Sequence, residues 1–137
     1  MKVKQYLMQA IVIRDMIKRT EAQIAEIRTK MEGVGSTRYD KLNVQSSPVD
    51  MMASYMDKLT KVEKREQRLL VNYYETYEKI QRQIDELDRP LYRQILSLRY
   101  LDGMSLFEIS KTLHYTYEYV RNLHGYALLE FARVNNM

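Results

Sequence analysis

Side chains able to hydrogen-bond to nucleic acid gather in one short segment near the carboxyl end of the chain. The segment holds Tyr117, Glu118, Arg121 and Asn122, with Gly125 one turn later. In a helix of 3.6 residues per turn, these positions share one face. Tyrosine hydroxyls, the Asn122 amide and the Arg121 guanidinium are groups that contact bases or phosphates in protein–DNA complexes. The face therefore suits contacts with double-stranded DNA.

The chain offers little for catalysis or for metal binding. His114 and His124 lie ten residues apart and the chain has no cysteine, so a zinc site lacks its usual ligands. Its carboxylates alternate with Lys and Arg, as in residues 61–66, which is typical of a solvated helix surface. No phosphate-binding glycine loop, nucleophile elbow or zinc-protease motif is present. We predict no enzyme activity, no catalytic or metal site and no cofactor.

Local signals predict the helices that must position this face. Ser105-Leu106-Phe107-Glu108 fits a capping box, and the preceding Asp102-Gly103 predicts a turn. The helix that follows should stop near Leu113, because the next residues interrupt the apolar pattern. Thr116 can cap a further helix, which places Thr116 at the edge of the proposed DNA-binding face. Pro90 marks an earlier boundary.

Three short helical segments are therefore expected, at Pro90–Leu101, Ser105–Leu113 and Thr116–Val134. Two helices joined by a turn of three or four residues form a helix-turn-helix, whose second helix enters the major groove. The apolar residues spaced to bury the inner faces are Leu98, Leu101, Ile109, Leu113, Val120, Leu123 and Ala127.

The run from 98 to 113, LRYLDGMSLFEISKTL, followed by TYEYVR at 116–121, resembles region four of bacterial sigma factors. It also resembles the phage activators of the RinA and ArpU type, which join long helices to such a module. The matching positions are the Arg99-Tyr100 pair, Ser105, Glu108 and Ile109 of the first helix, and Thr116, Val120 and Arg121 of the second. At His114 the family usually has a turn glycine, although histidine tolerates the left-handed region.

The resemblance implies a DNA-binding transcription regulator of phage or prophage genes, acting in the cytoplasm of the bacterial host cell. Its site residues would be Thr116, Tyr117, Glu118, Arg121, Asn122 and Gly125. A second interpretation stays open, in which the chain is a helical adaptor and the helix-turn-helix binds a protein partner such as RNA polymerase.

Two long amphipathic helices are expected ahead of this module. The first carries an apolar stripe at heptad spacing, at Val3, Tyr6, Ala10, Ile13, Ile17, Thr20, Ile24, Ile27 and Met31. A loop at 33–47 separates it from a second helix, at 48 to about 88, which Ser47 caps and Pro48 starts. That helix must pack against the first helix or against another copy of the chain.

The predicted organisation is therefore a coiled-coil-like region for oligomerisation at 1–88 and a helix-turn-helix domain at 89–137. We expect a homo-oligomer with an all-α fold, consistent with four Gly and two Pro, 45% hydrophobic and 29% charged residues. No window approaches 18 uninterrupted apolar residues, so we expect a soluble, intracellular protein without a membrane span.

The positive charge is concentrated away from the predicted DNA-binding module. Residues 1–47 carry nine basic and five acidic side chains, whereas residues 90–137 carry five and four, within a total of +4. A DNA-reading module usually presents a strongly basic face. We therefore expect the amino-terminal basic helix, or a second module in a dimer, to supply the missing charge.

Overall fold

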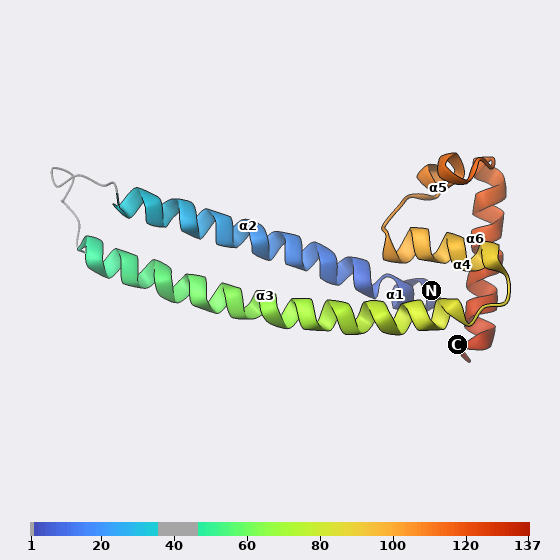
Figure 1. The fold of residues 1–137 in the computed structure, drawn as a ribbon, viewed down its shortest axis with the longest axis horizontal. Helices are drawn as coiled ribbons and strands as arrows, with labels where there is room; N and C mark the ends of the chain where they lie inside the picture. Colours follow the sequence, from blue (N-terminus) through green and yellow to red (C-terminus); the bar gives the residue numbers. More distant parts are fainter. Residues whose placement is uncertain (1, 36–46) are drawn as a thin grey trace. The chain divides into compact units, whose positions relative to one another are not determined.

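The computed structural model describes residues 2–35 and 47–137, and all the regular structure in these ranges is helical (Figure 1). The elements are α1 (Lys2–Leu7), α2 (Gln9–Gly35), α3 (Pro48–Asp85), α4 (Pro90–Leu96), the π-helical segment η2 (Ser97–Leu101), α5 (Leu106–Leu113) and α6 (Tyr117–Val134). The predicted all-α fold is confirmed. Of the loop predicted at 33–47, residues 33–35 belong to α2, and residues 36–46 lie outside the described ranges.

The contacts within the chain divide it into two compact units. Asp15–Val71 form the first, which we call the helical pair. Met1–Arg14 together with Asn72–Met137 form the second, which we call the larger unit. No helix in the described ranges is long and apolar enough to cross a membrane.

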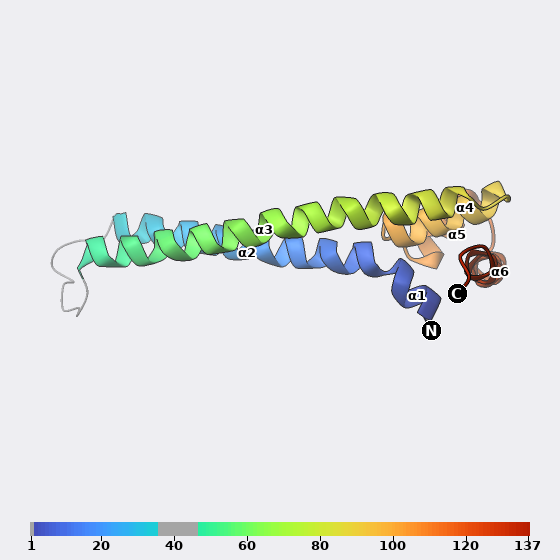
Figure 2. The same cartoon turned by 90° about the horizontal axis from the view of Figure 1, so that it is seen from below.

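In the helical pair, α2 and α3 lie side by side in both views (Figures 1 and 2). The predicted stripe of α2 faces this contact, since Ile17 and Thr20 are buried along with Leu59 of α3. An ion pair joins Arg28 Nη2 to Glu63 Oε2 at 3.2 Å. Ser47 caps α3 as predicted, because its Oγ accepts a hydrogen bond from the Asp50 amide at 3.2 Å. The long helices therefore pack against each other within the chain.

The larger unit encloses the main apolar cluster. Val3 and Leu7 of α1 pack there with Ile80 and Ile84 of α3 and with Phe131 of α6, all of them buried. A single helix from Val3 to Met31 was expected, but the helix is interrupted at Met8. Residues 2–14 contain neither Gly nor Pro, and the Met8 amide still donates to the Lys4 carbonyl at 2.9 Å. The interruption falls directly after Leu7, which packs against α3 and α6.

A second cluster holds the helix-turn-helix together. Ile95 of α4, Ile109 of α5 and Val120 of α6 are completely buried at its centre. The predicted inner-face residues follow this arrangement: Leu101, Ile109, Val120 and Ala127 are buried, and Leu98, Leu113 and Leu123 are half-buried. In both views α6 runs across the direction of α4 (Figures 1 and 2).

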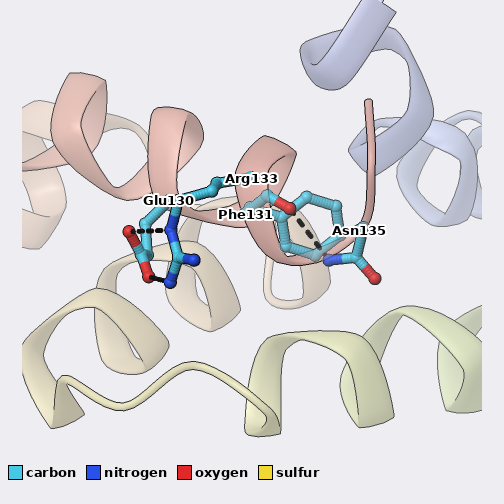
Figure 3. Close-up of polar contacts among 4 residues, drawn as sticks. All are labelled: Glu130, Phe131, Arg133 and Asn135. Atoms are coloured by element: carbon cyan, nitrogen blue, oxygen red, sulfur yellow. Dashed lines mark hydrogen bonds and ion pairs between the residues drawn. The ribbon is translucent and has the colours of Figure 1, made fainter.

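The carboxyl end of α6 is tied to its own last turn and to α3. The Asn135 side-chain amide donates to the Phe131 carbonyl at 2.9 Å (Figure 3). Asn135 Oδ1 also accepts from Gln83 Nε2 of α3 at 3.2 Å. On the surface of the same turn, Arg133 Nε donates to Glu130 Oε2 at 3.2 Å. These contacts fix the end of the helix whose beginning carries the candidate site.

Candidate nucleic-acid interface

Helix α5 begins with the predicted capping box. Ser105 Oγ accepts from the Glu108 amide at 3.1 Å, and Glu108 Oε1 accepts from the Ser105 amide at 3.1 Å. These hydrogen bonds from Ser105, the backbone one first, lower the pKa of the Glu108 carboxyl below its usual value. The two side chains thus accept hydrogen bonds from backbone N–H groups that would have no partner in an uncapped helix.

The turn between α5 and α6 contains a left-handed residue and a side-chain cap. His114 adopts φ 61° and ψ 38°, the left-handed conformation expected at the position of the family's glycine. The Tyr115 amide donates to the Ser110 carbonyl at 3.0 Å, which closes the end of α5. Thr116 Oγ1 accepts from the Tyr119 amide at 3.2 Å and caps α6, as predicted.

All six candidate site residues are exposed: Thr116, Tyr117, Glu118, Arg121, Asn122 and Gly125. Their neighbours Val120 and His124 are buried, so exposed and buried residues occupy different faces of α6. The structure therefore brings the candidate residues onto one solvent-facing surface of α6.

Aromatic rings hold the basic side chains of this surface in place. The Phe107 and Tyr117 rings meet edge to face with centroids 6.4 Å apart, which joins the start of α5 to the start of α6. The Arg121 guanidinium lies 5.9 Å from the Tyr117 ring centroid, and Lys111 Nζ lies 4.5 Å from that of Phe107. Such cation–π contacts limit the positions that the cations explore.

A groove of about 1080 Å³ runs along this side of α6, between α1, η2 and the start of α5. Arg121, Asn122 and Gly125 line it from α6, and Lys4 and Arg99 line it from α1 and η2. Among the described residues that line the groove, none is acidic. The sequence did not indicate this groove, because its walls come from opposite ends of the chain.

Tyr100 and His124, which also line the groove, form a buried polar pair. The Tyr100 hydroxyl and His124 Nε2 are 2.8 Å apart, and the rings stack with centroids 5.7 Å apart. Burial, followed by the positive charges of Lys4 and Arg99, lowers the pKa of His124 from 6.5 to about 4. Burial likewise raises the pKa of Tyr100.

The sequence contains a signal for this pair. His124 is four residues from both Val120 and Leu128, which places it on the apolar face of α6. A buried histidine needs a hydrogen-bond partner, and Tyr100 provides it. In the described ranges, no group of three or more His, Cys, Asp and Glu side chains is arranged to hold a metal ion.

Residues 89–130 match the family model of sigma-70, region 4. This range covers α4, η2, α5 and most of α6. Residues 89–130 form a sigma region four-like helix-turn-helix. The match assigns the segment to a regulatory class of DNA-binding module and covers less than a third of the chain. No curated protein and no solved structure matches the chain.

Proposed function

We propose that the chain is a transcription regulator of phage or prophage genes that reads duplex DNA with α6. The observation that carries the proposal is the exposed surface of Tyr117, Arg121 and Asn122 on the second helix of a sigma region four-like helix-turn-helix. In this class of module, residues in the first half of the second helix contact base edges in the major groove.

The chemistry of the exposed residues supports distinct roles. Arg121, held beside the Tyr117 ring, can donate to a guanine edge or to a phosphate. Asn122 can pair with an adenine edge, and Glu118 can accept from a cytosine amino group. Thr116 and Gly125 border these contacts at the two ends of the surface.

The alternative proposal is an adaptor that binds a protein such as RNA polymerase through the same module. It is favoured by large apolar side chains left in solvent, since Phe107, Tyr126 and Leu129 are 54%, 59% and 63% exposed. Exposed apolar side chains that gather on one side of a domain often mark a protein interface.

Replacing Arg121 by alanine tests the proposal. A duplex obtained by selection in vitro should bind the parent protein, with an affinity that falls steeply as salt rises. Loss of one base-reading arginine costs about 1–3 kcal/mol, so Arg121→Ala should raise Kd by at least about fivefold. Fluorescence anisotropy across a salt series measures both effects.

Arg133→Ala is the matched control, because Arg133 lies on α6 outside the proposed surface and pairs with Glu130. It should leave Kd within about twofold of the parent, as expected for an arginine outside the contact. Equal losses for the two variants, or no salt-sensitive duplex binding by the parent, would favour the adaptor.

Gly125→Ala should separate stability from binding. A Cβ atom at Gly125 would meet nothing within 4 Å, and the residue lies inside α6. Alanine in an exposed helix interior is more favourable than glycine by about 0.5–1 kcal/mol, so the variant should unfold at higher urea concentration. The added methyl would project into the proposed DNA surface, and the same protein should bind the selected duplex more weakly. A variant that is no more stable than the parent contradicts the first part, and unchanged affinity contradicts the second.

We also propose that residues 1–88 mediate self-association and that residues 89–137 act as the functional module. Ile17 and Thr20 are covered within the chain, so self-association would use other apolar side chains. Val49, Met56 and Val71 of the helical pair are 76%, 48% and 58% exposed and remain for this role. A dimer would also present two modules to a symmetric DNA site.

A further inference from the structure

We propose that α1 belongs to the DNA interface and that Lys4 binds a phosphate of the duplex that α6 reads. The inference rests on the proposed function and extends it to a residue 85 positions before the start of the region 4 match. The carrying observation is that Lys4 lines the same groove as Arg121 and Asn122.

Packing fixes α1 where Lys4 can serve this role. Val3 and Leu7, on either side of Lys4, are 8% and 0% exposed in the cluster that contains Ala127 and Phe131 of α6. Lys4 itself is exposed. The backbone of α1 that carries Lys4 is therefore held in place by buried neighbours. Less conformational entropy is then lost when the Lys4 ammonium group binds an anion.

The charges around the groove select for an anion. Lys4, Arg99 and Arg121 line it from α1, η2 and α6, and no acidic residue is among the described residues of its lining. Lys4 and Arg99 each lower the pKa of His124, which shows that their positive charges act on the same part of α6. A concave surface lined by charges of one sign concentrates the electrostatic field and attracts the opposite charge.

The position of the groove beside the reading surface identifies the anion as DNA phosphate. A helix about 10–12 Å wide fills a major groove about 12 Å wide, so side chains at its flank meet the sugar-phosphate backbones. Lys4 and Arg99 line the same groove as Arg121 and Gly125 of α6. Lys4 also supplies positive charge from outside the helix-turn-helix segment, whose own sequence is only weakly basic.

The experiment compares Lys4→Gln with Lys2→Gln by duplex binding across a salt series. Lys2 is exposed on the same helix but does not line the groove, so its substitution removes the same charge without the contact. Lys4→Gln should raise Kd about three- to tenfold and reduce the slope of log Kd against log salt by about 0.9, the value for one lost phosphate contact. The loss should be the same on the selected and on an unrelated duplex, because phosphate contacts carry no sequence information. Lys4→Arg should bind like the parent.

Three results would overturn the inference. If the parent binds duplex through Arg121 while Lys4→Gln matches Lys2→Gln, the proposed function stands and the role of α1 falls. If the parent protein shows no salt-sensitive binding to duplex DNA, both the proposed function and the role of α1 are wrong. The third result is that the parent protein does not bind duplex DNA but binds poly-L-glutamate, and that Lys4→Gln abolishes this binding. The groove would then be a site for an acidic polypeptide. Thermal unfolding of each variant, expected to match the parent, keeps folding defects from being counted as binding defects.

Discussion

Phe131→Ala should lower the free energy of unfolding by about 3–5 kcal/mol, the usual cost of removing a fully buried phenylalanine. The side chain is 0% exposed in the cluster that joins α1, α3 and α6, and its ring lies 6.1 Å from that of Tyr6. Alanine would leave a cavity between three helices, which are anchored at different points and cannot close over it fully. Urea unfolding followed by circular dichroism measures the change as a lower midpoint.

Leu129→Ala is the control for Phe131→Ala. Leu129 is two residues away on the same helix and 63% exposed, so its loss should change stability by no more than about 0.5 kcal/mol. The comparison also tests how far the module extends, since the region 4 match ends at residue 130 and Phe131 follows it. A cost below about 1 kcal/mol for Phe131→Ala, within the range of ordinary surface changes, would mean that α1 and the end of α6 do not form one core with the module.

The local features of the fold were predictable from the sequence because their causes lie within a few residues. The capping box at Ser105 and the cap at Thr116 follow from side chains and their nearest amides. The left-handed residue His114 lies where the apolar pattern of the preceding helix stops. The outward position of Arg121 and Asn122 follows equally from helical periodicity, because Val120 and Ala127 had to face the core. Binding of DNA by that face stays a prediction.

The features that were not predicted depend on contacts between distant residues. The break at Met8 lies next to Leu7, which packs against α3 and α6. The π-helical turn at Ser97–Leu101 has a hydrogen bond of 3.0 Å from the Asp102 amide to the Ser97 carbonyl, five residues earlier. Neither the break nor the π-helical turn contains a Gly or Pro that would indicate it in the sequence. The groove needs α1 beside α6, more than a hundred residues later in the chain, and periodicity carries no information about such pairings.

The stability of the larger unit should fall as the pH is lowered from about 6.5 to about 4, because of His124. The folded pKa of about 4 lies below the ordinary 6.5, since burial and then the charges of Lys4 and Arg99 disfavour the protonated ring. Below pH 6.5 the His124 side chain takes up a proton in the unfolded chain but not in the folded chain. Folding is therefore opposed increasingly down to about pH 4, and below that both states are protonated and the loss is constant. With 1.36 kcal/mol per pKa unit, the full effect is about 3 kcal/mol.

His124→Gln isolates this contribution from that of the carboxylates, which titrate in both proteins. Glutamine does not ionise in this range, and its side-chain carbonyl can still accept from the Tyr100 hydroxyl that His124 Nε2 contacts. The variant should be less stable than the parent at pH 7.5, because its shape fits the buried site less well. Between pH 6.5 and pH 4, the free energy of unfolding should nevertheless fall by about 3 kcal/mol less for the variant than for the parent. Urea unfolding at closely spaced pH values measures this difference. Parallel curves for the two proteins would mean that His124 accepts a proton in the folded state as readily as in the unfolded chain. In that case the ring would have to reach water, and the positive charges of Lys4 and Arg99 would have to act on it only weakly.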